Sequence, residues 1–484
     1  MKLFTNVPDF YNDISEEIRL FLPREEIVLS DSISDCDVSV LLTADEERFT
    51  ADCTFICGGN TYHYTETDPF RTGSEIIEKR YSKRCVKTGV FRTIRQAFPD
   101  KFMPWGSLTG IRPTRLLREL TETEGGEEAY RLMTGQFDVS PAKVALASEI
   151  NSVQQPVIDS ALPDEFGVYI GVPFCRTRCL YCSFASELRT KKTDMSAYLS
   201  ALQRDIEMGS RMAKAHGLVP RSFYMGGGTP TVLTESELDS LLACVSSCYD
   251  TAGKEFTVEA GRPDTITEGK LRVLKANGVT RISVNPQTMC DRTLRLVGRD
   301  HNAADIVECF NTARRIGFDS INMDLIAGLP NETADDFARS LEAVEALSPD
   351  CLTVHTLAIK RASRLKEHLD EYAFPSVEEV MHMVDMGSKA AARMGMKPYY
   401  MYRQKYMAGN LENVGYSKAG AVCIYNIDMM EDGVSIIAHG AGSMTKRVWA
   451  EGGRIERVPN PKDIATYIAK LDETQAVRER LFSL

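Results

Sequence analysis

The sequence contains no dense run of Lys or Arg and no apolar stretch near the roughly 18 residues that a membrane-spanning helix requires. With 57 Lys and Arg against 68 Asp and Glu, the net charge is -11, which disfavours nucleic acid as the main partner. Pro8 and Asp9 interrupt the region where a signal peptide would be continuously apolar. We therefore expect a cytoplasmic protein with no membrane span and no nucleic-acid partner.

The cysteines form no evenly spaced set that would suggest a disulfide framework. There are 13 of them, an odd number, and most are scattered along the chain. In a reducing compartment a scattered cysteine behaves as a small buried hydrophobic residue, whereas a tight cluster indicates a metal site. One such cluster exists, because Cys175, Cys179 and Cys182 are spaced C-x3-C-x2-C directly after an apolar run.

A chain of 484 residues is too long for one hydrophobic core, so two or three domains are expected. Near the N-terminus, strands are predicted at 37–42 and 50–64, the second broken by a Gly58-Gly59-Asn60 hairpin turn. A helix is predicted at 75–98, and a link with Pro156 and Pro163 at 149–165. Between them lie Arg112, Arg115 and Arg118, which could bind carboxylates or form a solvated helix face.

From residue 167 onward, strand and helix patterns alternate six times, which predicts a parallel sheet curled into a partial barrel. One helix, at 304–317, shows an apolar stripe of Ile306, Phe310, Ala313 and Ile316. The predicted strands are 167–172, 221–225, 255–259, 280–284, 320–326 and 351–357. The predicted helices are 195–216, 235–249, 268–277, 304–317, 335–347 and 377–395.

Parallel βα folds place ligands at the carboxyl ends of their strands, and the unusual residues of this chain fall there. They are the cysteines after the first strand, Gly226-Gly227-Gly228-Thr229 after the second, Glu259 ending the third, Gln287 after the fourth, Asp324 late in the fifth and His355 late in the sixth.

Three thiolates leave one position of a metal centre open, and no further Cys or His stands within the loop. This favours an iron–sulfur cubane with an external ligand, while a zinc knot or buried thiols stay as alternatives. The glycine loop could hold an anion or could be a tight turn. Glu259, Gln287, Arg299 and Asp324 could converge on one cavity, although each taken singly suits a surface or capping position.

The sequence around the cysteines resembles a known family. Phe-Cys-Arg-Thr-Arg-Cys-Leu-Tyr-Cys is similar to the cluster loop of the radical S-adenosylmethionine (SAM) superfamily. Tyr-Ile-Gly-Val-Pro-Phe-Cys, Met-Gly-Gly-Gly-Thr-Pro-Thr, Val-Glu-Ala-Gly-Arg-Pro-Asp, Ser-Val-Asn-Pro-Gln-Thr, Val-Gly-Arg-Asp-His and Asn-Met-Asp-Leu-Ile-Ala-Gly-Leu-Pro together resemble the oxygen-independent coproporphyrinogen III oxidase (coproporphyrinogen dehydrogenase) family. The resemblance covers about 165–445, and the N-terminal region resembles the extra domain of the longer branch.

This resemblance implies a [4Fe-4S] cluster on Cys175, Cys179 and Cys182, with SAM on the open iron and an electron donor such as flavodoxin or ferredoxin. Electron delivery would cleave SAM to methionine and a 5'-deoxyadenosyl radical. By motif position, the first SAM would contact Tyr169, Gly227, Glu259 and Met444. Family members can hold a second SAM, and those positions are Tyr181, Gly228, Thr229, Gln287, Arg299, Asp324 and Ala358.

The chain departs from the family at two places. The proven oxidases carry another cysteine two positions after the third cluster ligand, where this chain has Phe184. The haem-chaperone branch carries a His-Asn-x-x-Tyr-Trp signature, and the nearest match, at 425–430, lacks the His and both aromatic residues. Each departure weakens one of the two activities that the resemblance offers.

Two further features have alternative interpretations. The aromatic and cationic segment 399–405, with His439-Gly440-Ala441-Gly442-Ser443, could contact a flat tetrapyrrole or could be packed at a domain interface. His355 could be a core residue or a ligand.

Together these features predict an α/β protein: an N-terminal α+β accessory domain (1–160), a radical SAM partial (β/α)6 barrel (161–375) and a C-terminal domain (376–484). The expected function is anaerobic oxidative decarboxylation of coproporphyrinogen III to protoporphyrinogen IX by a monomer. The alternatives are a haem-binding chaperone, or a SAM-dependent methyltransferase or haem-degrading enzyme.

Overall fold

The computed structural model describes residues 1–23, 25–69, 75–109, 112–184, 186–190, 193–360, 362–404, 407–449 and 453–484. The chain forms two compact units. Unit 1 comprises Met1–Ser148 and Arg403–Leu411, and unit 2 comprises Glu149–Tyr402 and Glu412–Leu484. Within the described ranges, none of the helices has the length and apolar character needed to cross a lipid bilayer.

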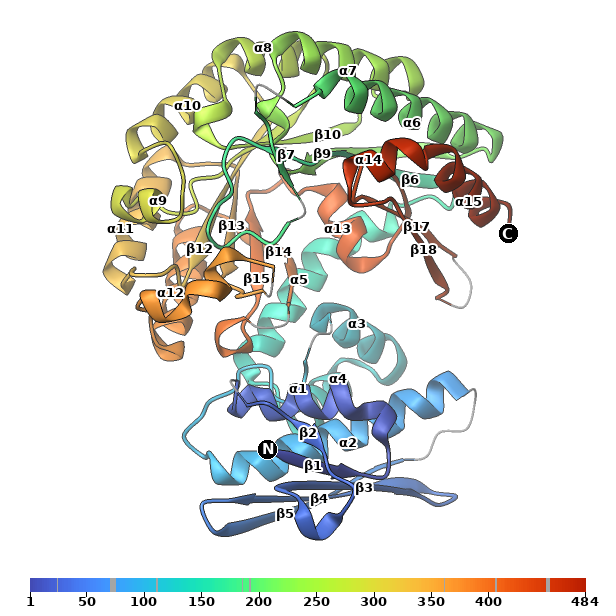
Figure 1. The fold of residues 1–484 in the computed structure, drawn as a ribbon, viewed down its shortest axis with the longest axis vertical. Helices are drawn as coiled ribbons and strands as arrows, with labels where there is room; N and C mark the ends of the chain where they lie inside the picture. The colour runs from blue at the N-terminus through green and yellow to red at the C-terminus, as the bar shows by residue number, and fades with distance from the viewer. Residues whose placement is uncertain are drawn as a thin grey trace. The chain divides into compact units, whose positions relative to one another are not determined.

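Unit 1 is built on a five-stranded sheet in the order β2-β1-β3-β4-β5 (Figure 1), in which β1 runs parallel to both β2 and β3 and the others are antiparallel. The predicted hairpin is confirmed, since Gly58 and Gly59 both have positive φ between β4 and β5. The strands are β1 (Lys2–Thr5), β2 (Val28–Leu29), β3 (Val38–Ala44), β4 (Arg48–Cys57) and β5 (Asn60–Pro69). The helices are α1 (Tyr11–Phe21), α2 (Glu75–Ala97), α3 (Pro113–Glu124) and α4 (Gly126–Arg131).

Arg115 is half-buried and forms an ion pair with Glu119 one turn further along α3, whereas the choice between a carboxylate site and a solvated face stays open for Arg112 and Arg118. The predicted link at 149–165 is wrong up to residue 159, because α5 (Pro141–Asp159) continues through Pro156. Pro163 does lie outside a helix, between α5 and the first barrel strand.

Unit 2 contains an eleven-stranded sheet in the order β14-β15-β13-β12-β11-β10-β9-β6-β16-β17-β18. All six predicted strands are present, and they run parallel to one another. In Figure 1 the helices α6 to α12 form an arc outside these strands, as in a partial barrel. The six strands are β6 (Glu165–Val172), β9 (Val219–Gly227), β10 (Glu255–Gly261), β11 (Arg281–Val284), β12 (Ser320–Ala327) and β13 (Cys351–Thr356).

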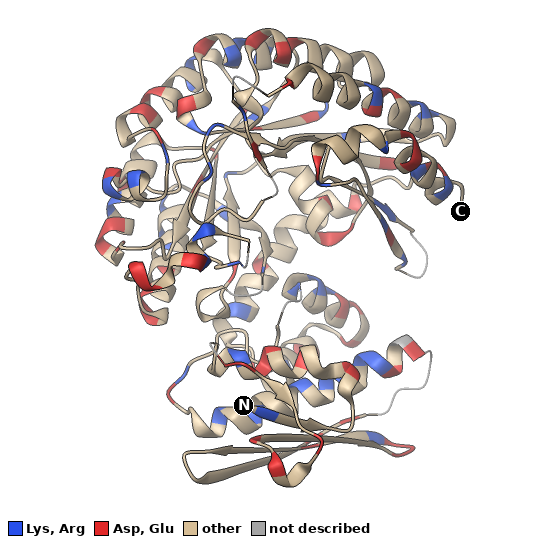
Figure 2. Cartoon of the chain, in the orientation of Figure 1, with Lys and Arg blue, Asp and Glu red and all other residues tan. Residues whose placement is uncertain are grey.

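The helices of the arc begin at side-chain caps that the local sequence supplies. Thr234 with Glu237, Asn302 with Asp305 and Thr333 with Asp336 form reciprocal capping boxes. Charged residues of both signs lie along the outer faces of these helices, while the strands carry few (Figure 2). The helices are α6 (Met195–Ala215), α7 (Glu235–Cys248), α8 (Glu268–Ala276), α9 (Asp291–Leu296), α10 (Ala303–Ile316), α11 (Ala334–Leu347) and α12 (Val377–Arg393).

The chain after residue 376 adds strands to both edges of the barrel sheet. β16 pairs parallel with β6 and is a seventh parallel strand that the six-unit pattern missed, while β15 pairs antiparallel with β13. This segment therefore shares one sheet with the barrel, and the division at 160 and 375 stays a prediction. Its elements are β14 (Lys397–Tyr402), β15 (Asn413–Ser417), α13 (Ile424–Glu431), β16 (Ser435–His439), β17 (Met444–Val448), β18 (Ile455–Pro459), α14 (Ile464–Ala469) and α15 (Leu471–Ser483).

Candidate active site

The cysteine loop begins at the carboxyl end of β6 and is closed at its base by two short parallel strands, β7 (Phe174–Cys175) and β8 (Glu187–Leu188). Within it, the backbone N–H of Cys182 donates to the carbonyl of Cys179 at 3.1 Å. The N–H of Leu180 donates to the carbonyl of Val297 at 3.0 Å, and the Thr177 hydroxyl donates to Gly298 at 2.8 Å. The loop is therefore fixed to the segment that follows β11 and α9.

The three thiols lie close enough to affect one another electrostatically. Burial raises the pKa of Cys182, and the neighbouring sulfurs of Cys179 and Cys175 raise it further. Among the described residues, no three His, Cys, Asp or Glu side chains are arranged to hold one metal ion. In a cubane each cysteine binds a different iron, so its ligands lie farther apart than those around one zinc ion. Cys175, Cys179 and Cys182 can therefore each bind one iron of such a cubane.

Cationic and hydroxyl donors surround these thiols. The Nη1 of Arg262 lies 3.7 Å from the Sγ of Cys179. Burial opposes the charge of Arg299, but the nearby Tyr181 and Cys179 hold the pKa of its guanidinium above its usual range. The Thr229 hydroxyl lies 3.7 Å from the Sγ of Cys175. Donors of this kind stabilise thiolates, the form in which cysteine binds iron. The donor set therefore suits an anionic iron–sulfur centre.

Of the donors to Cys179, Arg262 was not among the predicted site residues. A usable signal was present, since this arginine follows the third strand three positions after Glu259. Arg299 and Tyr181 were predicted from motif position, and the structure brings them together beside the cysteine loop.

The glycine loop after β9 runs directly alongside the cysteine loop. An added Cβ at Gly228 would lie 2.4 Å from the carbonyl oxygen of Phe174, and the N–H of Thr229 donates to that oxygen at 2.7 Å. Gly227 has a φ of +109°, and an added Cβ there would lie 3.3 Å from the backbone nitrogen of Val172. The space left by Gly228 is thus needed for backbone packing within the protein, in addition to any role toward a ligand.

Tyrosine rings and a carboxylate form one cluster at the inner face of β6, β9 and β10. Tyr169 stacks on Tyr224 with ring centroids 6.2 Å apart, and Tyr224 stacks on Tyr425 at 4.7 Å. The Tyr224 hydroxyl donates to the Oε1 of Glu259 at 2.6 Å. Burial raises the pKa of Glu259 to about 7, although the Tyr224 hydrogen bond opposes the shift. Tyr224, in β9, and Tyr425, in α13, were not predicted, because tyrosines in such elements are usually packing residues.

A second polar group spans β12, β13 and β14. The Nε2 of His355 lies 3.5 Å from the Oδ2 of Asp324, and the Tyr402 hydroxyl lies 3.2 Å from the Nδ1 of His355. The Nδ2 of Asn322 donates to the Oδ1 of Asp324 at 2.7 Å. Burial opposes ionisation of Asp324, but the hydrogen bond from His355 and its charge hold the pKa of that carboxyl below its usual range. His355 is thus a partnered residue with a side chain that is 23% exposed.

The remaining predicted residues are held at the same end of the sheet. Gln287 has a φ of +67°, and its N–H donates to the carbonyl of Asp324 at 2.8 Å. Ala358 follows β13 and is half-buried. Met444 begins β17 and is 44% exposed. Gly440, in the turn before Met444, lies against the backbone of Gly171 in β6.

Most of the aromatic segment near residue 400 is explained by packing. Tyr399, Tyr400 and Met401 lie in β14 and are almost fully buried, so their rings are not open to a flat ligand. His439 is fully buried, with its Nδ1 3.1 Å from Asp205 and its Nε2 2.9 Å from the hydroxyl of Tyr249. Lys405 lies outside the described residues. These side chains are therefore packed inside unit 2 itself, and the expected packing at a domain interface stays a prediction.

The comparisons with known proteins agree with this geometry. Residues 169–344 match the model of the radical SAM superfamily. The oxygen-independent coproporphyrinogen-III oxidase-like protein HemZ of Bacillus subtilis is 40% identical over 401 residues, which cover 81% of this chain and 80% of that protein. The heme chaperone HemW of the same organism is 34% identical over 194 residues, 40% of this chain and 50% of that protein.

The solved structure of coproporphyrinogen III oxidase (HemN) from Escherichia coli superposes with a TM-score of 0.51 at 22% identity. The superposed region covers 66% of this chain and 72% of the HemN chain. This similarity supports the barrel fold. Radical SAM proteins carry a [4Fe-4S] cluster and SAM, and these are the cofactors of this chain. The protein therefore belongs to the oxygen-independent coproporphyrinogen III oxidase-like family of the radical SAM superfamily.

Proposed function

We propose that this protein is a radical SAM oxidoreductase that converts coproporphyrinogen III to protoporphyrinogen IX without oxygen. The observation that carries the proposal is the 40% identity, over four fifths of both chains, to a protein named coproporphyrinogen-III oxidase-like. The meeting of the predicted site residues at the carboxyl ends of the barrel strands supports it, because parallel βα folds bind their ligands there.

In this proposal Cys175, Cys179 and Cys182 hold the cluster, and SAM binds its open iron. When bound and reduced, these cofactors supply the one-electron cleavage of SAM that makes abstraction of a propionate hydrogen feasible. The first SAM is held by Tyr169, Gly227, Glu259 and Met444. A second SAM, where present, is held by Tyr181, Gly228, Thr229, Gln287, Arg299, Asp324 and Ala358.

The protein's own residues would bind and orient the reactants. An ionised Glu259 beside the Tyr169 and Tyr224 rings offers an acceptor for an ammonium group. Asp324, kept ionised by His355, offers a second acceptor for hydroxyl or N–H donors. The buried strands around both carboxylates keep water away from the reacting carbon. After abstraction of one hydrogen atom from a propionate, release of CO2 and transfer of one electron to an external acceptor would leave a vinyl group.

Phe184 is the residue that argues most directly against this activity. It stands where the oxidases that this chain resembles have a cysteine, and its side chain is 67% exposed. An exposed phenylalanine has no group that could replace a thiol in proton or electron transfer. The substrate must therefore be tested directly.

The deciding experiment incubates anaerobically reconstituted protein with SAM, a reductant and coproporphyrinogen III, and follows tetrapyrroles by chromatography and mass. We expect vinyl products together with deoxyadenosine and methionine. The variant with Cys175, Cys179 and Cys182 all changed to alanine should lose iron, SAM cleavage and product. Cys244→Ala is the matched control, because Cys244 is a half-buried cysteine on α7 outside the loop. SAM cleavage without any vinyl product would exclude the decarboxylase.

A haem chaperone is the second candidate, favoured by the 34% identity to the Bacillus subtilis heme chaperone HemW. It predicts stoichiometric haem uptake without conversion, which an anaerobic haem titration measures. The methyltransferase or haem-degrading alternative instead predicts S-adenosylhomocysteine, methylthioadenosine or ring-opened tetrapyrroles in the same product analysis.

A further inference from the structure

Arg262 is a buried cation aimed at the cysteine loop. It follows β10 and is 3% exposed. Its Nη1 donates to the carbonyl of Thr177 at 3.2 Å and lies 3.7 Å from the Sγ of Cys179. A buried guanidinium is costly unless its charge is compensated, so its partners on every side matter.

The opposite edge of the same guanidinium is held by a carboxylate. The Nε and Nη2 of Arg262 donate to the two oxygens of Asp264 at 2.9 Å and 3.2 Å. The Nδ1 of His301 lies 3.3 Å from Asp264, and Arg176 of the cysteine loop donates to its backbone carbonyl at 2.8 Å. This two-point pairing fixes the plane of the guanidinium and therefore the direction of Nη1.

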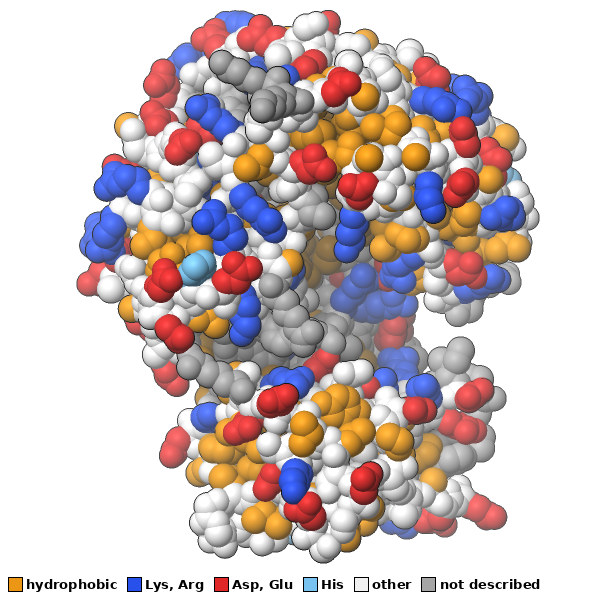
Figure 3. All heavy atoms as spheres, in the orientation of Figure 1, with side chains coloured by type: hydrophobic (Ala, Val, Ile, Leu, Met, Phe, Trp, Pro, Cys, Tyr) orange, Lys and Arg blue, Asp and Glu red, His pale blue; other side chains and the backbone are white. Residues whose placement is uncertain are grey.

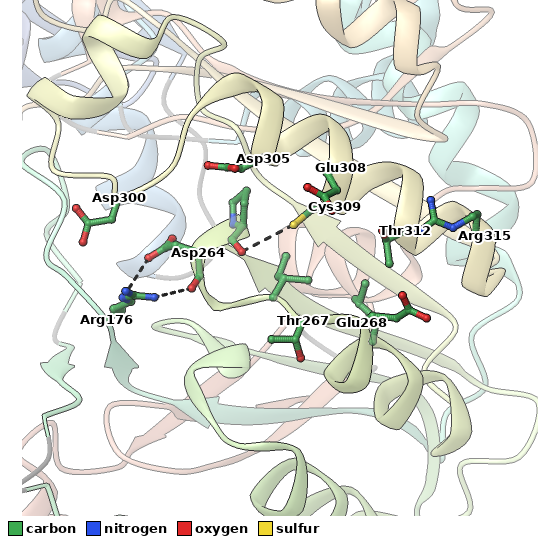
Figure 4. A pocket seen from close by; sticks show the side chains of 13 residues that line it. Arg176, Asp264, Thr267, Glu268, Asp300, Asp305, Glu308, Cys309, Thr312 and Arg315 are labelled. Carbon is green, nitrogen blue, oxygen red and sulfur yellow. Dashed lines mark hydrogen bonds and ion pairs between the residues drawn. The ribbon is translucent and has the colours of Figure 1, made fainter.

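Asp264 borders a groove between α8 and α10, with a volume of about 510 Å³ (Figure 4). Arg176 and Asp264 face each other at one end of it, near the cysteine loop. The carboxylate side chain itself is only 4% exposed. The Arg262–Asp264 pair thus lies between the groove and the Cys179 sulfur.

The three cysteines differ in the donors that reach them. Cys179 has the guanidinium group of Arg262 at 3.7 Å, whereas Cys175 has the neutral hydroxyl of Thr229 at the same distance. A cationic donor to a thiolate ligand stabilises the more negative, reduced state of a cluster. Hydrogen bonds to the sulfur ligands are one of the means by which proteins set cluster potentials.

We infer that Arg262, oriented by Asp264, is a positioning residue of the iron–sulfur site that raises the reduction potential of the cluster through the Cys179 thiolate. The inference rests on Cys179 being a cluster ligand, and it is independent of the substrate. Arg262 therefore makes one-electron reduction of the cluster easier for the electron donor.

The test is an anaerobic redox titration of the reconstituted protein, without SAM or tetrapyrrole, followed by the electron paramagnetic resonance signal of the reduced cluster. In Arg262→Gln we expect reduction to become at least tenfold less favourable, a fall of about 59 mV for a one-electron couple. Iron content and thermal unfolding are measured on the same samples, because a purely structural role would change them and leave the potential unchanged.

Arg281→Gln is the matched control. Arg281 is also a buried arginine of the barrel sheet, 8% exposed, but it begins β11 at the amino end and donates to the carbonyl of Ala421. Its loss should lower stability and leave the potential at the wild-type value. If the Arg262→Gln protein loses its iron, the titration is repeated with Arg262→Lys. The lysine ammonium can pair with Asp264 but cannot also reach Cys179, so the same fall in potential is expected. An iron-retaining variant at residue 262 with the potential of the Arg281→Gln control would overturn the inference.

The redox titration contains no substrate, so its result does not depend on the result of the vinyl-product assay. An unchanged potential leaves the decarboxylase proposal untouched. Absence of vinyl product leaves the role of Arg262 untouched.

Discussion

Protonation of Glu259 should control how tightly the protein binds SAM. Burial raises the pKa of this carboxyl to about 7, against a usual value of 4.5. A shift of that size corresponds to about 3 kcal/mol of free energy favouring the neutral form. In our proposal it is the ionised form that accepts the ammonium group of SAM, so binding must be accompanied by loss of the proton below pH 7.

The expected magnitude follows from the fraction of Glu259 that is ionised. Between pH 8 and pH 6 that fraction falls about tenfold for a pKa near 7, so the Kd for SAM should rise about tenfold. Glu259→Gln should bind SAM more weakly at pH 8 and should lack this part of the pH dependence. Protonation of SAM itself changes the Kd of the wild type and of Glu259→Gln by the same factor, so it cancels when the two pH dependences are compared.

Calorimetry or equilibrium dialysis on anaerobically reconstituted protein, at constant ionic strength, measures these Kd values. Asp428→Asn is the matched control, because burial also raises the pKa of Asp428 to about 7. Asp428 lies on α13 and forms an ion pair with Arg221 of β9, so it is not among the residues assigned to SAM. The control should keep the wild-type pH dependence. Equal slopes in wild type and Glu259→Gln would refute the assignment of Glu259 to SAM.

Three further predictions concern the scaffold and the cysteine loop. Gly228→Ala should lower the free energy of unfolding by about 1–3 kcal/mol and reduce the iron content, because the added Cβ would meet the Phe174 carbonyl. Gly126→Ala is the control, since a Cβ there meets no other atom, and denaturant unfolding should find it near neutral. Asp205→Asn should lower the unfolding free energy by about 3–5 kcal/mol, because it leaves the fully buried Arg478 without its carboxylate partner at 2.6 Å; unchanged thermal unfolding would contradict this. Phe184→Cys should leave stability and iron content unchanged because Phe184 is 67% exposed, and a gain of vinyl product in that variant would identify the missing cysteine as the limiting group.

On the face that Figure 3 shows, acidic and basic side chains both lie over the outer helices. This agrees with the lack of a dense basic run in the sequence.

The local pattern of the sequence was enough to locate the barrel elements. All six predicted strands and all six predicted helices are present with boundaries within a few residues, since strand and helix periodicities and the caps at Thr234, Asn302 and Thr333 are local signals. The order of unusual residues at strand ends also follows from the alternation, because parallel strands bring their carboxyl ends to one edge.

Only the tertiary structure determined which distant residues meet. The contact of Arg262 with Cys179 joins residues 83 positions apart, and Tyr224 reaches Glu259 across 35 positions. The parallel pairing of β16 with β6 depends on a strand far along the chain, and no local period encodes it. Periodicity reports which face of an element is apolar, whereas these contacts depend on how the sheet curls and on which side chains fill its interior. The sequence by itself therefore determined the barrel elements and the cysteine loop, and the fold alone decided the donors around that loop.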